Sequence, residues 1–188
     1  TGVTFRTFAP SASRIAVIGE FNDWQESEMN KVYDGNFWEC YIPEAKPGQM
    51  YKYRIYDRND NPVDHCDPYG YGMELRPNCA SIGRDVSKYK FKDSKWMQNR
   101  SDCRKKPLNI YEIHFGSFRK PSDKTDGWYT YEEMIDILIP YLTENGYNCL
   151  EIMPLNEYPC DESWGYQATG FFSPTSRYGT ADQLKAFV

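Results

Sequence analysis

The chain has 188 residues and a formal net charge of −5, with 22 lysines and arginines against 27 aspartates and glutamates. This acidic balance argues against a nucleic-acid partner, which requires a basic surface. No stretch approaches the roughly 20 apolar residues of a membrane-spanning helix, and residues 1–5 show no feature of a signal peptide. We therefore expect no membrane partner.

Six cysteines occur, at positions 40, 66, 79, 103, 149 and 160, and no two of them have Cys-x-x-Cys spacing. A zinc site is therefore not expected, and a chain of this size can form a hydrophobic core without a disulfide framework. We expect free thiols in a reducing, cytoplasmic environment, and we expect neither a metal nor a cofactor.

Up to about residue 100, short segments separated by turns are typical of β-strands. The segments with strand character are residues 3–7, 14–18, 37–42 and 51–56. Asp34-Gly35 is a hairpin-turn signal before the third segment. In the fourth segment, Tyr51 and Tyr53 share one face and Lys52 lies on the other. This pattern predicts a small antiparallel β-sandwich.

A polar, charged stretch at residues 99–107 predicts a linker. It divides the chain into a first domain at residues 1–98 and a second at residues 108–188. The second domain begins with a strand-like segment at residues 108–114, and residues 149–153 form a mostly apolar run that is typical of a buried parallel strand.

A helix is predicted between these two strands. A Thr-x-x-Glu capping box at residues 130–133 precedes an apolar stripe with helical spacing, and Asn-Gly at residues 145–146 is a good C-terminal stop. Pro140 lies within the stripe and should kink the helix, with a break at this position as the alternative. A Thr-x-x-Gln capping box at residues 180–183 predicts the start of another helix.

The second domain therefore contains one βαβ unit and the opening of another. A sheet of two parallel strands cannot bury both of its faces. We expect further elements to complete it, either from the same chain beyond Val188 or from a partner.

Three segments resemble known sequences. Residues 19–24 (Gly-Glu-Phe-Asn-Asp-Trp) look like the signature of the family 48 carbohydrate-binding module, an Ig-like sandwich that precedes the barrel in branching and debranching enzymes. Residues 111–117 (Tyr-Glu-Ile-His-Phe-Gly-Ser) resemble the first barrel strand of the α-amylase superfamily in its branching-enzyme form. The run from Ser163 to Thr180 is similar to the loop after the second barrel strand of glycogen (1,4-α-glucan) branching enzymes, in glycoside hydrolase family 13.

This resemblance implies an Ig-like β-sandwich followed by the first βαβ portion of a (β/α)8 TIM barrel. The implied activity is that of a retaining glycosyltransferase, which cleaves α-1,4-glucan and transfers the segment to a 6-hydroxyl, forming α-1,6 branches in glycogen biosynthesis. It uses two carboxylates about 5 Å apart. In the family, the nucleophilic Asp and the acid/base Glu follow the fourth and fifth strands, so we expect both beyond Val188 and expect this chain alone to be inactive.

The resemblance also assigns substrate-binding residues in the second domain. Tyr166 matches the aromatic residue that supports the sugar beside the scissile bond, in the −1 subsite; the alternative is a buried Tyr that closes the loop. Trp164 and Gln167 either line the same pocket or hold the loop in place. His114 is expected to be structural, within the strand core.

Three acidic residues also lie near this loop, namely Glu157, Asp161 and Glu162. They follow a barrel strand, where TIM-barrel sites form. Adjacent acidic residues in loops are more often solvated or structural, so we expect none of them to be catalytic.

In the sandwich, Trp24 and Lys52 match residues that contact glucan in related modules, and they form the candidate glucan platform. Trp38 alternates with apolar neighbours and is expected in the core. A second tryptophan that such modules often carry is missing between Asp57 and Pro62. The alternative role of the sandwich is packing against the barrel.

The expected partners are therefore α-glucan or glycogen, and the remainder of the chain's own barrel. Two other functions stay open. The chain could belong to a related debranching or trehalose-releasing hydrolase, although the Gly-Ser at residues 116–117 disfavours that assignment. It could also act as a non-catalytic glucan-binding protein.

Overall fold

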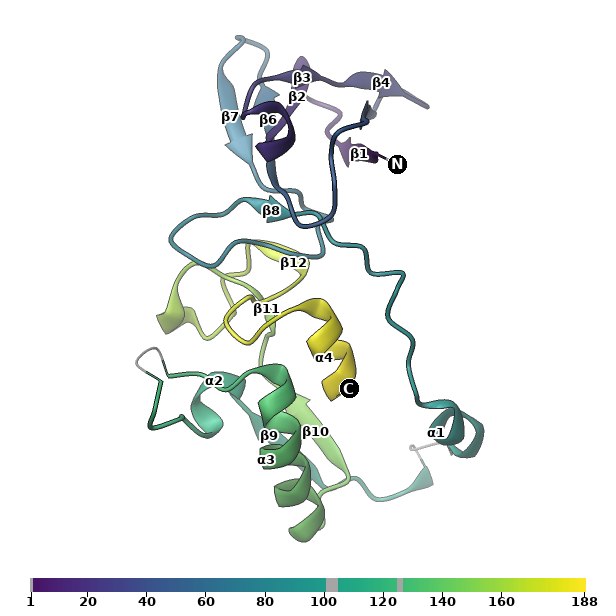
Figure 1. The fold of residues 1–188 in the computed structure, drawn as a ribbon, viewed down its shortest axis with the longest axis vertical. Coiled ribbons are helices and arrows are strands. Elements are labelled where there is room, and N and C mark those ends of the chain that lie inside the picture. Colours follow the sequence, from purple (N-terminus) through teal and green to yellow (C-terminus); the bar gives the residue numbers. More distant parts are fainter. Residues whose placement is uncertain (1, 101–104, 125–126) are drawn as a thin grey trace.

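The computed structural model describes residues 2–100, 105–124 and 127–188. The predicted linker at 99–107 lies partly outside these ranges, so the proposed domain boundaries stay predictions. Cys103 also lies outside them, and the other five cysteines carry free thiols. Figure 1 shows a lobe of strands at one end, and a second lobe that holds β9, β10, α2 and α3 at the other.

The first lobe contains two antiparallel sheets. The smaller sheet has the spatial order β1 (Val3–Phe8), β5 (Phe37–Ile42) and β4 (Asn30–Val32). The larger sheet has the order β3 (Ser27–Glu28), β2 (Arg14–Gly19), β6 (Met50–Tyr56) and β7 (Pro62–His65), and β8 (Ser81–Ile82) also pairs with β6. All four strand segments expected from the sequence are confirmed.

One hydrophobic core lies between these sheets. Phe5 of β1 packs in it with Ile15 and Val17 of β2 and with Tyr51 and Tyr53 of β6. The residues of β2 and β6 come from alternate positions, because successive side chains of a strand point to opposite faces. The shared core confirms an antiparallel β-sandwich.

Trp38 of β5 belongs to the same core, as expected. Its side chain is buried, and its Nε1 donates to the carbonyl oxygen of Ala9 (3.0 Å), so the indole N–H is satisfied. The predicted turn at Asp34-Gly35 joins β4 to β5, which pair in antiparallel register.

The second lobe contains the predicted βαβ unit. Strands β9 (Ile110–Ile113) and β10 (Cys149–Ile152) are parallel, and α3 (Tyr131–Glu144) connects them. Helix α3 begins at the predicted capping box, where the hydroxyl of Thr130 accepts from the Glu133 backbone N–H. It continues through Pro140 as one element, so a break there is wrong. The buried Leu138 and Leu142 on either side of Pro140 hold both parts of the helix against the same core.

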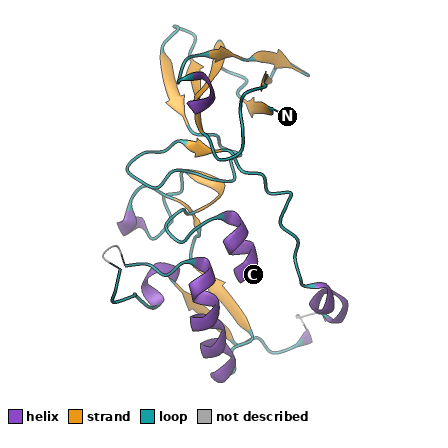
Figure 2. Ribbon diagram, in the orientation of Figure 1, coloured by secondary structure: helices purple, strands orange, loops and turns teal. Residues whose placement is uncertain are grey.

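The segment after β10 is more ordered than the expected long loop (Figure 2). It contains an antiparallel pair, β11 (Asn156–Glu157) and β12 (Gly170–Pro174), with the short 3-10 helix η3 (Asp161–Ser163) between them. Other helical elements among the described residues are η1 (Glu20–Asn22), α1 (Ser94–Asn99), α2 (Phe115–Phe118) and α4 (Ala181–Phe187). Helix α4 begins at the second predicted capping box.

The two lobes meet through residues 66–86, which lie against the segment after β10. The hydroxyl of Ser176 donates to the Met73 carbonyl oxygen, and the rings of Tyr69 and Phe172 stack with centroids 6.2 Å apart. Within the described ranges, no helix combines the length and the apolar character needed to cross a membrane.

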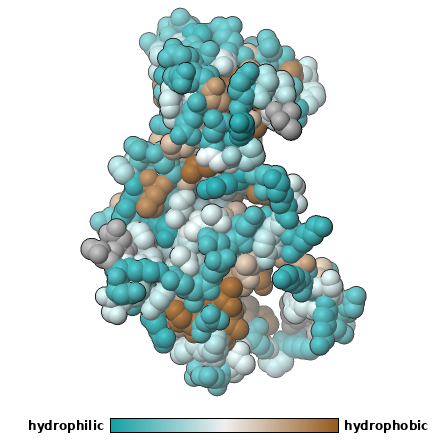
Figure 3. Space-filling view, in the orientation of Figure 1, coloured by the Kyte–Doolittle hydropathy of each residue, from teal (hydrophilic) through white to brown (hydrophobic). Residues whose placement is uncertain are grey.

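Hydrophobic side chains also gather on the surface of the second lobe, where α3, β9 and β10 lie (Figure 3). Leu108, Ile110 and Ile139 are among the exposed large apolar residues. The sheet of β9 and β10 is therefore only partly covered, as expected for two parallel strands.

Candidate functional site

The candidate site lies where β9 and β10 end. A tight turn after η3 carries the aromatic residues, with Trp164 in the left-handed region (φ 55°) and Gly165 following at φ 92°. A Cβ at Gly165 would come within 2.5 Å of the Pro154 carbonyl oxygen, so this position requires glycine. The backbone N–H of Tyr166 donates to the Ser163 carbonyl oxygen (3.0 Å) and closes the turn.

This turn directs two aromatic side chains to the surface. Trp164 is 53% exposed and Tyr166 is 66% exposed. Tyr166 is therefore accessible in this chain, which favours contact with a ligand over closure of the loop by a buried ring. Gln167 is also exposed on the same loop. An exposed ring that its backbone holds in place is suited to bind the apolar face of a ligand at low entropic cost.

His114 joins this cluster from the end of β9. Its ring stacks on Trp164 with centroids 5.5 Å apart, and its Nδ1 lies 2.9 Å from the Ser117 hydroxyl. His114 precedes α2 and is half-buried, so the expected position within the strand core is wrong. Burial and, less strongly, the charge of Lys120 lower the pKa of His114, which favours the neutral ring.

A buried polar cluster around Arg177 and Glu157 lies beside the aromatic turn. The guanidinium of Arg177 is fully buried and donates to Glu157, which is 2% exposed, over 2.8 Å. Glu157 also accepts from the Thr175 hydroxyl (3.0 Å) and the Ser176 backbone N–H (2.6 Å). The Arg177 side chain reaches η3 as well, where its Nε donates to Asp161 over 3.0 Å. These contacts tie β11, η3 and residues 175–177 into one unit.

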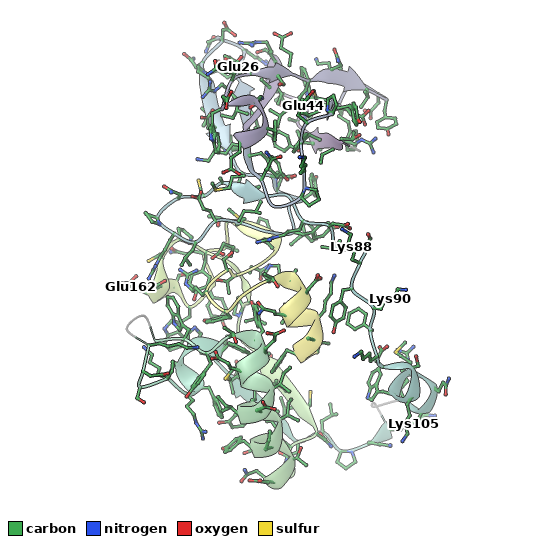
Figure 4. All side chains as sticks on the ribbon, viewed as in Figure 1. Glu26, Glu44, Lys88, Lys90, Lys105 and Glu162 are labelled. Carbon is green, nitrogen blue, oxygen red and sulfur yellow. The ribbon has the colours of Figure 1, made fainter. Side chains whose placement is uncertain are left out.

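The same contacts argue against catalysis by the acidic residues. Glu157 is buried and paired. Burial alone would raise the pKa of Asp161, but hydrogen bonds from Arg76 and Arg177 outweigh it and lower that pKa. Glu162 points away from the lobe in Figure 4 and accepts from the Cys160 thiol. The expectation that none of the three is catalytic stays a prediction.

Sequence reasoning did not identify Arg177 as a central residue. It lies within the family-like run from Ser163 to Thr180, and that position was the available signal. A lone arginine in a polar loop is usually solvated. Only the fold shows that Glu157, twenty residues earlier, is its buried partner.

The candidate platform on the sandwich is built on the turn after β2. The side chain of Asn22 accepts from the Gly19 backbone N–H (2.9 Å) and donates to the Val17 carbonyl oxygen (3.1 Å), which fixes the turn. Trp24 follows in the left-handed region (φ 59°) and is exposed. Lys52 on β6 lies opposite Ile18 of β2 and is half-buried.

The two candidate sites belong to different lobes. Glu26, two residues after Trp24, and Glu162, two residues before Trp164, are labelled in separate lobes in Figure 4. A single short ligand therefore cannot be assigned to both. Their roles in binding stay predictions.

Comparisons with known proteins agree with this organisation. Residues 1–70 match the family of carbohydrate-binding module 48 (isoamylase N-terminal domain). The chain is 44% identical over 187 residues to a 1,4-alpha-glucan branching enzyme of Fusobacterium nucleatum, covering 98% of this chain and 30% of that protein. It is also 44% identical over 192 residues to the corresponding enzyme of Bacillus caldolyticus, covering 100% of this chain and 28% of that protein.

A solved structure supports the fold. A Salmonella typhimurium protein, provisionally named an alpha amylase, superposes with a TM-score of 0.77 at 26% identity, covering 100% of this chain and 29% of that one. This chain thus spans about 30% of the length of the curated relatives that it matches. Over 98–100% of its own length, the chain is similar to 1,4-alpha-glucan branching enzymes.

Proposed function

We propose that this chain is the N-terminal part of a 1,4-α-glucan branching enzyme. In this proposal, residues 1–98 form a glucan-binding module and residues 108–188 form the first portion of a (β/α)8 barrel. The observation that carries it is the presentation of Trp164 and Tyr166 at the end of β10, in a chain whose whole length matches branching enzymes. Barrel enzymes place their sites at the carboxyl ends of the strands.

The proposed role of the aromatic turn is to form one wall of the −1 subsite. The ring of Tyr166 would lie against the sugar and favour the positive charge that develops in an oxocarbenium-like transition state. Trp164, held by its stack on His114, would support the adjacent part of the glucan. Gln167 would add a hydrogen bond to a sugar hydroxyl.

The proposed chemistry is retaining transfer. A carboxylate attacks the anomeric carbon while a carboxylic acid protonates the departing glycosidic oxygen, which breaks the α-1,4 bond. The 6-hydroxyl of an acceptor glucan then attacks the glycosyl intermediate and gives its proton to the second carboxylate. From the resemblance to branching enzymes, we infer that both carboxylates follow the fourth and fifth barrel strands. The hydrogen bonds of Glu157 and Asp161 with Arg177 support a location outside this chain.

The proposed role of the sandwich is to hold glucan on Trp24 and Lys52. The match of residues 1–70 to a carbohydrate-binding family supports this role. The contacts between residues 66–86 and the segment after β10 support an additional packing role for the sandwich. Free thiols are consistent with our inference that the enzyme is cytoplasmic.

Replacement of Tyr166 by alanine tests the subsite. In a chain extended to the length of its relatives, Tyr166→Ala should lower the branching rate, followed by the iodine-stain shift, about thirtyfold, as expected for a desolvated contact between a ring and a cation. Tyr33→Ala, on the exposed surface of the sandwich, serves as the control and should leave the rate unchanged.

Near wild-type turnover of Tyr166→Ala would remove Tyr166 from the subsite. The 188-residue chain alone should show no branching activity. Robust activity in that chain would contradict the placement of the two carboxylates.

A further inference from the structure

A cavity of about 550 Å³ opens at the end of the sandwich that faces the second lobe. It is bounded by residues 3–6 of β1, by β6, and by residues 67–71 and 82–84. Its size lies within the range of roughly 300–1,000 Å³ that is typical of small-ligand pockets. Neither Trp24 nor Lys52 lines it.

Aromatic rings form part of the cavity wall. Phe5 contacts Phe21 with ring centroids 5.0 Å apart and Tyr51 with centroids 4.9 Å apart. Because Phe5 and Tyr51 belong to the sandwich core, these rings are fixed in place. Tyr69 and Tyr71 also line the cavity, and each is about half exposed. The cavity therefore joins a rigid apolar wall to two accessible rings.

A buried carboxylate lines the same cavity. Asp67 is 8% exposed. Its Oδ2 accepts from the hydroxyls of Tyr51 (2.7 Å) and Tyr53 (3.4 Å), and its Oδ1 accepts from the Tyr69 backbone N–H (2.8 Å). A carboxylate can accept about four hydrogen bonds, so Asp67 keeps acceptor capacity for a ligand hydroxyl. The arrangement also holds the Tyr51 ring in a single orientation.

Donors complete the lining. Gln49 accepts from the Lys46 backbone N–H (2.7 Å) through its Oε1, which leaves its NH₂ group as a donor. Arg84 lies against Gly72, where a Cβ would meet the Arg84 side chain at 2.8 Å, so glycine permits this close approach. Gln49 and Arg84 both line the cavity.

We propose that this cavity binds one or two glucose units of an α-glucan, as a second glucan subsite separate from Trp24 and Lys52. This inference rests on the proposed function. Sugars present apolar C–H faces for the rings and hydroxyls for Asp67 and Gln49. A purely apolar ligand would leave the polar groups of the lining without hydrogen bonds.

Site-resolved titration of the 188-residue chain tests the subsite. Adding maltotriose and recording amide NMR spectra should shift the backbone resonances of Gly70, Gly83 and Arg84. Tyr71→Ala and Gln49→Ala should each weaken the binding seen at these amides about tenfold, without changing the response near Trp24. Tyr41→Ala, an equally exposed tyrosine outside the cavity, is the matched control.

A third variant separates the two sites. Trp24→Ala should abolish the response near residue 24 and leave that of the cavity amides intact. Shifts confined to the Trp24 region, with Tyr71→Ala and Gln49→Ala both unchanged, would overturn the second subsite and leave the proposed function standing. If maltotriose and glycogen produce no response in either region, glucan binding by the module fails, and the subsite fails with it.

Discussion

Two ion pairs of the sandwich and one of the second lobe lie in opposite environments. On the sandwich, Arg14 pairs with Glu26 over 2.9 Å and Arg54 pairs with Asp64 over 2.8 Å, and all four side chains are about one-third exposed. In the second lobe, the Arg177–Glu157 pair is almost completely buried. Removing solvent from two charges is costly unless further hydrogen bonds satisfy them, and the contacts of Glu157 with Thr175 and Ser176 do so.

The difference shows how each lobe fixes its irregular segments. The sandwich buries apolar residues from both sheets, so its charges can stay at the surface. The segment after β10 consists mostly of short elements and turns, which offer little regular apolar surface. A buried ion pair with fixed geometry holds that segment instead, and thereby the turn that carries Trp164 and Tyr166.

Removing the buried arginine should have the largest effect. Arg177→Met leaves the Glu157 carboxylate buried without its partner, which should lower the free energy of unfolding by about 3–5 kcal/mol. Arg14→Met removes a surface pair of the sandwich and should cost less than about 1 kcal/mol. Urea unfolding followed by tryptophan fluorescence measures both. If the two variants lose similar amounts of free energy of unfolding, burial does not decide how much each ion pair contributes to stability.

The boundary between the lobes offers the second test. Met73 is 1% exposed, its sulfur lies close to Gly170, and its carbonyl oxygen accepts from the Ser176 hydroxyl. Met73→Ala should therefore cost about 2–3 kcal/mol, near the lower end for a buried methionine. Met97→Ala, on an exposed helix, is the matched control and should change the free energy of unfolding by less than about 0.5 kcal/mol.

The regions in which Met73→Ala increases hydrogen exchange test whether Met73 couples the two lobes. Because Met73 connects residues 66–86 to the segment after β10, hydrogen exchange should increase in both lobes. Faster exchange confined to residues 66–86 would show that this segment does not couple the lobes.

Much of the fold follows from local sequence patterns. Alternation in β6, the Asp34-Gly35 turn and the two capping boxes all predicted elements that the structure confirms. These patterns predict structure correctly because each of the elements depends mainly on residues that are close together in the sequence. The choice between continuation and a break of α3 at Pro140 was not predictable in this way, because it depends on the packing of Leu138 and Leu142.

The candidate site was only partly predictable for the same reason. The family-like run pointed to Trp164 and Tyr166, and the structure adds that both are exposed. The stack of His114 on Trp164 and the Arg177–Glu157 pair join residues from separate elements. Such contacts depend on how β9, β10 and the segment after them pack, and no spacing in a single sequence encodes them.

The smallest expected effect comes from an ion pair of the second lobe that lies at its surface. Hydrogen bonds from Lys124, and then from the backbone and hydroxyl of Thr130, lower the pKa of Glu133 from 4.5 to about 2. A carboxyl whose pKa is lower in the folded state stabilises the protein above its unfolded value, and that stabilisation is lost as the pH falls from about 4.5 to about 2. Because Glu133 is solvent-exposed, we expect a contribution below about 1 kcal/mol.

Replacing this residue completes the comparison of surface and buried pairs. Glu133→Gln should flatten the dependence of the melting temperature on pH between about 4.5 and 2. If Glu133→Gln lowers the free energy of unfolding as much as Arg177→Met does, the second lobe depends on its surface ion pairs as strongly as on its buried one. If Glu133→Gln lowers the free energy of unfolding only slightly, as expected for Arg14→Met, burial decides how much an ion pair contributes to stability in both lobes.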